Sequence, residues 1–152
     1  MQYYLASSLE EQELKESIQV ANSLALSRLN KECRRKLERK FNDNPMGIHI
    51  HCPDGSVSKD GPSAGTALTV LLYSMYNDIK IKHEVAITGE INLKGEVTKI
   101  GGLEEKLQGA KRAGVKLVLI PKSNLKDLDK IKRRNSKLID SNFKVKPVSK
   151  IN

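Results

Sequence analysis

Apolar residues recur every three to four positions through the first quarter of the chain. Between residues 8 and 41 these positions hold Leu14, Ile18, Ala21, Ala25, Leu29 and Cys33. Side chains with this spacing share one face of an α-helix, so the pattern predicts a single helix over 8–41 with one stripe against a core. A short strand over 2–6 is predicted before it, and the run Asn42-Asp43-Asn44-Pro45 is predicted to end it.

The next segment changes to a period of two. In residues 47–52, Ile48, Ile50 and Cys52 alternate with His49 and His51, which predicts a strand with one apolar face. A loop rich in Gly, Pro, Ser and Asp follows over 53–62, and an apolar helix is predicted over 63–76.

The second half alternates short strands with helices. Its predicted elements are a buried strand over 84–88, a hairpin over 90–100 that turns at Lys94-Gly95, a helix from Gly101-Gly102 to Gly114, a strand over 116–120, a basic helix and a last strand over 143–145. This order predicts one α+β domain over 1–152, with a mixed sheet and packed helices.

Composition excludes several classes of protein. At 152 residues and 38% apolar content, the chain fits one globular domain with its own core. It has no run of about 18 apolar residues that could cross a membrane, and its first residues lack the pattern of a signal peptide. The only two cysteines, Cys33 and Cys52, do not form a Cys-x-x-Cys pair. We therefore expect an intracellular, cytoplasmic protein with no membrane partner.

The net charge of +9 is unevenly distributed along the chain. Residues 28–40 hold seven basic and two acidic side chains, residues 122–152 hold ten and three, and the remainder sums to −3. A basic cluster is either a solvated surface or a site for nucleic acid or another acidic partner. Both interpretations stay open.

One serine stands at a position suited to a nucleophile. The segment Lys59-Asp60-Gly61-Pro62-Ser63-Ala64-Gly65 delivers Ser63 to the start of the apolar helix, where free N–H groups and the positive helix pole could stabilise an oxyanion. The alternative is that Ser63 is a helix N-cap. Gly61 to Gly65 also matches the Gly-x-Ser-x-Gly motif of α/β-hydrolases, but the acid and histidine expected after the serine are represented only by Asp78 and His83, and the chain is short for that fold.

Because no histidine stands out as the base, we consider the lysines. His49 and His51 precede Ser63 and lack further ligands at metal-binding spacing. Lys106 falls on the apolar stripe of its predicted helix, together with Leu103, Leu107 and Ala110, and a desolvated neutral lysine can act as a base. The alternative is a lysine with a buried stem and a solvated head. Lys59 and Lys99 are weaker candidates.

Four blocks of sequence together resemble the proteolytic domain of Lon-type ATP-dependent proteases. They are His49-x-His51-x-Pro53, Lys59 to Gly65, Thr88-Gly89-Glu90-Ile91-x-Leu93-x-Gly95-x-Val97 and Ile100-Gly101-Gly102-Leu103-x-Glu105-Lys106. The resemblance extends from about Glu16 to Pro121 and keeps the order and spacing of the family. It implies a Lon-protease-like fold and a serine endopeptidase that uses a Ser–Lys dyad.

The resemblance also assigns individual roles. It makes Ser63 the nucleophile and Lys106 its general base, with Thr88 expected to hydrogen-bond the lysine amine. Asp60 corresponds to a supporting residue of the active-site loop. Neither a metal nor an organic cofactor is implied for this chain.

Whole Lon proteins carry an ATPase module, which would use ATP and magnesium, but the chain has no Gly-x-x-x-x-Gly-Lys-Ser/Thr motif. The resemblance therefore implies an ATPase elsewhere, in the full-length protein or in trans, that supplies unfolded or damaged polypeptide, and a homo-hexameric ring. It also implies a domain cut close at both ends, as an excised fragment or a natural minimal relative. The alternative function is a non-catalytic Lon-like assembly or nucleic-acid-associated module that uses the basic segments.

Overall fold

The computed structural model describes residues 9–43, 45, 48–50 and 61–152. In chain order, the helices and strands in these ranges are α1 (Leu9–Ser27), α2 (Lys31–Asp43), the 3-10 helix η1 (Gly61–Ala64), α3 (Gly65–Asn77), β1 (Val85–Ile87), β2 (Glu90–Ile91), β3 (Val97–Thr98), α4 (Leu103–Arg112), β4 (Leu117–Pro121), the 3-10 helix η2 (Lys122–Asn124), α5 (Leu125–Arg134) and β5 (Lys144–Val148). The elements predicted from residue 63 onward are confirmed, with shifted boundaries. The strand predicted over 2–6 lies outside the described residues.

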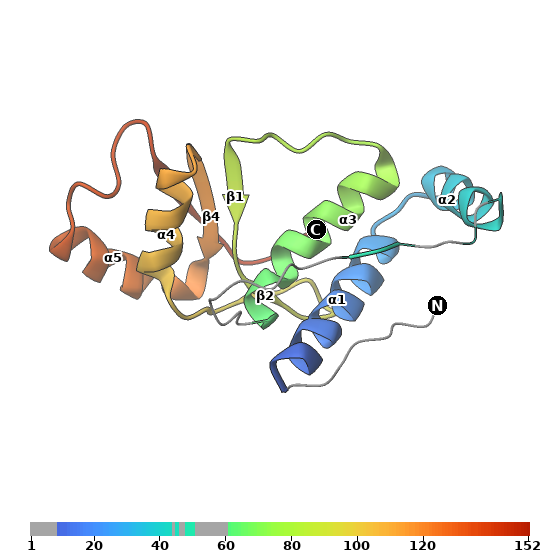
Figure 1. Cartoon of the computed structure of the whole chain (residues 1–152), viewed down its shortest axis with the longest axis horizontal. Helices are drawn as coiled ribbons and strands as arrows, with labels where there is room; N and C mark the ends of the chain where they lie inside the picture. The colour runs from blue at the N-terminus through green and yellow to red at the C-terminus, as the bar shows by residue number, and fades with distance from the viewer. Residues whose placement is uncertain (1–8, 44, 46–47, 51–60) are drawn as a thin grey trace.

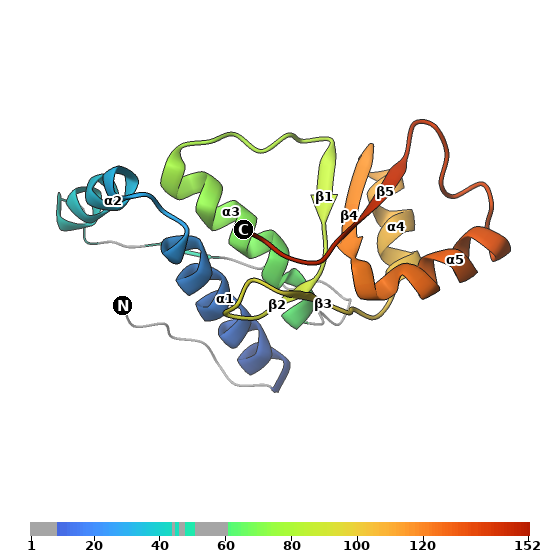
Figure 2. The same ribbon diagram turned by 180° about the vertical axis from the view of Figure 1, so that it is seen from behind.

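Parallel and antiparallel pairing are both present, as the prediction of an α+β domain with a mixed sheet requires. Strands β1, β4 and β5 form a parallel sheet in the order β1-β4-β5, and β2 and β3 form an antiparallel hairpin. Beyond β5 the chain runs back along the hairpin, where the Val97 N–H donates to the Ser149 carbonyl at 2.9 Å. Figure 2 shows β5 beside β4 and the C-terminal segment passing towards the hairpin.

Two hydrophobic cores lie on either side of β1. Helices α1 and α3 pack against each other through Ala21, Ala25, Leu68 and Leu72, all of them buried. Helices α4 and α5 pack with β4 around a second buried cluster that includes Leu107. Figure 1 shows α4, α5 and β4 to the left of β1 and α1, α2 and α3 to its right. Residues on β1 and in the segments after it therefore lie between the two helical groups.

The prediction of one helix over 8–41 is wrong, because the helix is interrupted after Ser27. The Asn30 side chain starts a second helix, since its Oδ1 accepts the Cys33 N–H at 2.8 Å. This is the usual N-cap hydrogen bond, which satisfies one of the N–H groups that lack a partner in the first helical turn. The apolar period continues through the break, because Leu29 and Cys33 still face the core formed by α1 and α3.

The strand predicted over 47–52 is also wrong in its described part, because residues 48–50 are not assigned to a strand. The alternation itself is present: Ile48 and Ile50 pack against the α1–α3 core, while His49 is exposed. An extended backbone is enough to alternate side chains, whereas a strand also needs a hydrogen-bonded neighbour. Residues 47, 51 and 52 lie outside the described ranges.

Within the described ranges, none of the helices combines the length and the apolar character that crossing a bilayer requires.

Candidate active site

Ser63 lies in η1, directly before α3, and its backbone is tied to the segment that follows β1. Its carbonyl oxygen accepts the Gly89 N–H at 3.0 Å and the Thr88 hydroxyl at 3.3 Å. Thr88 is itself attached to the sheet, since its N–H donates to the Leu119 carbonyl at 3.0 Å and continues the β1–β4 pairing. The serine is therefore positioned by the carboxyl end of β1.

Thr66 strengthens this attachment from the other direction. Its N–H and its hydroxyl both donate to the Gly89 carbonyl, at 3.0 and 2.8 Å. Thr66 is fully buried, and burying a hydroxyl is favourable only when it has such a partner. Hydrogen bonds thus run in both directions between the start of α3 and Thr88-Gly89, and together they hold Ser63 beside the end of β1.

Lys106 approaches Ser63 from α4, on the other side of β1. Its neighbours on the inner face of this helix, Leu103 and Leu107, are buried in the second core, so the lysine stem emerges next to packed apolar side chains. The half-buried Lys106 amine lies 3.2 Å from the Ser63 hydroxyl oxygen, within hydrogen-bond distance. The tertiary structure thus brings together two side chains that stand 43 positions apart in the sequence.

No described carboxylate forms an ion pair with Lys106, although five other pairs are present in the described part of the chain. The hydrogen-bond partner of the Lys106 amine is the Ser63 hydroxyl.

Of the two residues expected to support the dyad, one is described. Thr88 lies beside Ser63, and its hydroxyl donates to the Ser63 carbonyl at 3.3 Å. In this arrangement Thr88 positions the serine backbone. The expected hydrogen bond between Thr88 and the Lys106 amine stays a prediction. Asp60 lies outside the described residues.

Of the two weaker lysine candidates, Lys99 is described, and it pairs with a residue other than Ser63. The Lys99 side chain is 61% exposed and pairs with Asp127 at 3.2 Å, near the start of α4. The bond from Lys99, followed by one from Asn124, holds the pKa of Asp127 below its ordinary value. Lys59 lies outside the described residues.

The histidines and cysteines are not gathered into a metal site in the described ranges, where no cluster of three or more His, Cys, Asp or Glu side chains could hold an ion. His49 and His83 are exposed, and the Cys33 thiol is free and packs beside the α1–α3 core. His51 and Cys52 lie outside the described residues.

An open groove of about 340 Å³ adjoins the residue before Ser63. Its walls are α1 and the β2–β3 hairpin, and its lining combines apolar groups such as Pro62, Val20 and Ile91 with carboxylates such as Glu16 and Glu90. This side of the site is therefore open to the surface.

Three residues that position the site were not found from the sequence. The only sequence signal of Thr66 is that it is a polar residue in an apolar helix. Gly89 belongs to the Thr88-Gly89-Glu90 block, but the sequence assigns it no role. Asn124, which bonds the segment before α4, left none that distinguishes it from any loop asparagine. Their importance depends on partners that are distant in sequence.

Comparisons with known proteins are consistent with this geometry. Residues 4–152 match the model of the family described as Lon protease (S16) C-terminal proteolytic domain. Similar proteins include the Lon protease of Clostridium beijerinckii, 51% identical over 78% of this chain, and the Lon protease of Haemophilus influenzae, 48% identical over the same share. A Lon protease homolog of Acanthamoeba polyphaga mimivirus is 41% identical over 93% of the chain. In each case the match covers 14% of the relative's own length.

Proposed function

The chain belongs to the family of Lon protease (S16) C-terminal proteolytic domains, and on that premise we propose that it is a serine endopeptidase with a Ser63–Lys106 dyad. The observation that carries the proposal is the 3.2 Å distance between the Lys106 amine and the Ser63 hydroxyl. A nucleophile and its base must lie within this reach for proton transfer to accompany attack.

In the proposed reaction, neutral Lys106 removes the proton from the Ser63 hydroxyl as its oxygen attacks the carbonyl carbon of a peptide bond. The tetrahedral intermediate collapses when the resulting ammonium returns the proton to the leaving amine. Water then attacks the acyl-enzyme, with Lys106 again as the base, and releases the second product.

The negative oxygen of the intermediate needs hydrogen-bond donors. Ser63 is the third residue of η1, and we propose that backbone N–H groups of this turn donate to the negative oxygen. Pro62 has no N–H to contribute. The bonds from Gly89 and Thr88 to the Ser63 carbonyl fix the peptide unit that follows Ser63, which carries the Ala64 N–H.

We further propose that the substrates are unfolded or damaged polypeptides delivered by an ATPase in the same protein or in trans, and that the working assembly is a cytoplasmic homo-hexamer. The chain spans only 14% of the length of the relatives compared above. The proposals on substrates, ATPase and assembly therefore rest on membership of the family alone. The chemistry assigned to Ser63 and Lys106 uses no metal or organic cofactor, whereas ATP and magnesium would serve the ATPase.

Peptide hydrolysis by a small set of variants tests the dyad. With a quenched fluorescent peptide as substrate, Ser63→Ala and Lys106→Ala are expected to lower kcat at least about 10³-fold, because members of a catalytic unit fail together. Lys106→Arg is expected to be as inactive as Lys106→Ala, since a guanidinium keeps the positive charge but cannot accept a proton. Ser123→Ala and Lys126→Met, both at exposed positions, are the matched controls and should keep full activity.

Two results would remove the proposal. One is activity in Ser63→Ala equal to that of the wild type. The other is an active Lys106→Arg variant, which would show that the charge of Lys106, and not its lone pair, is what matters.

The alternative of a nucleic-acid-associated module is less well supported. The basic residues lie mainly on α2 and on α5 with the segment after it, and Figure 1 shows α2 and α5 at opposite ends of the molecule. Two separated patches do not make one continuous track for a polyanion. Filter binding across a salt series would detect such a role through a steep loss of affinity.

A further inference from the structure

Both members of the proposed dyad are positioned from the same edge of the parallel sheet. Strands β1 and β4 are parallel neighbours, so the segments that follow them emerge side by side. The segment after β1 holds Ser63 through Gly89 and Thr88. The segment after β4 is η2, and it ends in Asn124, the side chain that holds the start of α4.

Asn124 is fully buried and pairs with the backbone of a single residue. Its Oδ1 accepts the Ile100 N–H at 3.0 Å, and its Nδ2 donates to the Ile100 carbonyl at 2.9 Å. The Asn124 amide therefore satisfies both the N–H and the carbonyl of Ile100, as the backbone of a neighbouring strand would. The Nδ2 also donates to Asp127 at 2.9 Å, and Asp127 is paired with Lys99, which fixes the orientation of the amide.

The bonded residue, Ile100, lies six positions before Lys106. Between them the chain passes through Gly102, whose φ of 61° lies in the left-handed region, and the first turn closes with a bond from the Lys106 N–H to the Gly102 carbonyl. A displacement of Ile100 is therefore transmitted through about one turn of helix to the residue whose amine must lie 3.2 Å from Ser63.

We propose that Asn124 is a positioning residue of the peptidase reaction, acting through Ile100 and the start of α4 to hold Lys106 at Ser63. The inference rests on the proposed function. Without the amide, the Ile100 N–H and carbonyl are buried with no partner, and the segment must shift to find one. A shift of about 1 Å at a catalytic base costs roughly a hundredfold in rate.

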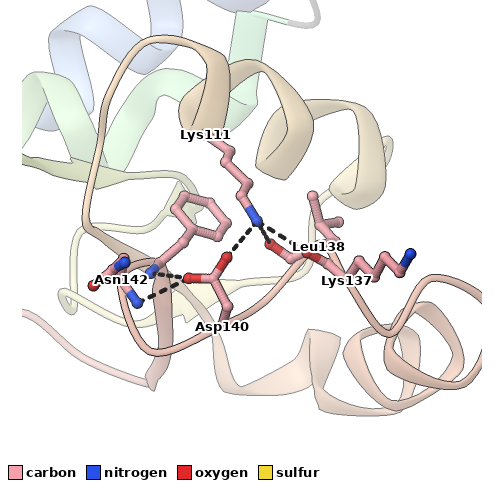
Figure 3. A network of polar contacts seen from close by, with 6 residues as sticks. Lys111, Lys137, Leu138, Asp140 and Asn142 are labelled. Carbon is pink, nitrogen blue, oxygen red and sulfur yellow. Dashed lines mark hydrogen bonds and ion pairs between the residues drawn. The ribbon is translucent and has the colours of Figure 1, made fainter.

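The C-terminal end of α4 provides the matched control. There Lys111 donates to the carbonyls of Lys137 and Leu138 and to Asp140, at 2.9, 2.8 and 2.7 Å, and lies over the Phe143 ring. Figure 3 shows this network joining α4 to the loop before β5. It has as many polar bonds as Asn124 makes, but it ties down the loop and lies beyond Lys106 in the chain.

The test measures the reaction of Ser63 with excess fluorophosphonate, which reports both the labelled fraction and the rate constant. Asn124→Ala is expected to lower the rate constant at least tenfold while the labelled fraction stays near that of the wild type, and to lower kcat for the fluorescent peptide with KM within twofold. Lys111→Met is expected to keep the rate constant within twofold. A purely structural role of Asn124 would instead lower the labelled fraction and leave the rate constant unchanged, and that result overturns the inference.

A double-mutant cycle shows whether Asn124 acts through Lys106. Adding Asn124→Ala to Lys106→Ala should cause no further loss of Ser63 reactivity, because the group being positioned is gone. A further tenfold loss in that background overturns the inference. If circular dichroism shows that Asn124→Ala does not fold, Asn124→Asp replaces it. This variant keeps the acceptor for the Ile100 N–H and loses the donor to the Ile100 carbonyl. An intermediate rate constant is expected for it, and a wild-type rate constant counts against the inference.

The same experiments separate this inference from the proposed function. If Lys106→Ala reacts as fast as the wild type, the dyad itself is wrong. If Lys106→Ala is slow and Asn124→Ala is fast, the dyad stands and only the role of Asn124 fails.

Discussion

Adding a single methyl group at Gly89 should disturb the position of Ser63. A Cβ added there would lie 2.6 Å from the Val97 Cγ1 and 2.7 Å from the Thr66 Oγ1. Both atoms belong to packed elements, β3 and the start of α3, so neither neighbour can simply swing away. The backbone of residue 89 must therefore retreat, and it carries the N–H that holds the Ser63 carbonyl.

The size of the effect follows from these distances. Ordinary contact begins at 3.4 Å, so the new methyl group and its neighbours must separate by roughly 0.8 Å. Such overpacking costs about 1–3 kcal/mol, whereas replacing glycine with alanine gains about 0.4–1 kcal/mol by restricting the unfolded chain. The steric cost is the larger of the two. We expect Gly89→Ala to lower the free energy of unfolding by about 1–2 kcal/mol and to slow peptide hydrolysis tenfold to a hundredfold, since the Ser63 hydroxyl moves relative to Lys106.

Urea denaturation and peptide hydrolysis measure the two effects, and Gly109→Ala is the matched control. Gly109 lies in α4 with no atom within 4 Å of an added Cβ, so alanine should raise the free energy of unfolding by about 0.5–1 kcal/mol through helix propensity. The same substitution thus has opposite signs at the two positions. A Gly89→Ala variant as stable and as active as the wild type would refute the reasoning.

Two further predictions concern stability. Asn30→Ala removes the cap that starts α2 and should cost about 1 kcal/mol, seen as faster amide hydrogen exchange in the first turn of α2, including Cys33; unchanged exchange would contradict the assignment of the cap. The hydrogen bond from Lys111, followed by the backbone N–H of Asn142, holds the pKa of Asp140 below its ordinary value. Its ionised form therefore stabilises the fold at pH values above the unfolded pKa, and this contribution is lost as the pH falls through the lower folded pKa. Asp140→Asn should flatten this acid limb of the urea midpoint plotted against pH, and an identical limb in both proteins would show that Asp140 has no part in it.

Local sequence predicted the helices and strands well where a single element explains the pattern. The hairpin turn at Lys94-Gly95 is an example, since Gly95 has a φ of 79° and its N–H donates to the Asn92 carbonyl. The errors occurred where periodicity continued through a change in backbone. A stripe of apolar residues does not reveal that Asn30 interrupts its helix, because both helices face the same core.

The sequence by itself determined which residues could carry chemistry. It placed Ser63 at the beginning of an apolar helix and Lys106 on an apolar stripe, and the motifs linked the two to one family. These features are local, so spacing and residue type are enough to find them. Each nevertheless kept a plain alternative, a helix cap for the serine and a solvated lysine for the base.

Only the tertiary structure decided that the two side chains meet and what holds them there. The 3.2 Å contact depends on β1 and β4 being neighbours, so that the segments after them approach from two sides. It also decided that Thr88 binds the serine carbonyl and that Asn124 binds Ile100. These bonds join residues 24 or more positions apart, and no local pattern encodes such a pairing, because it exists only after the strands have set the distance between the segments.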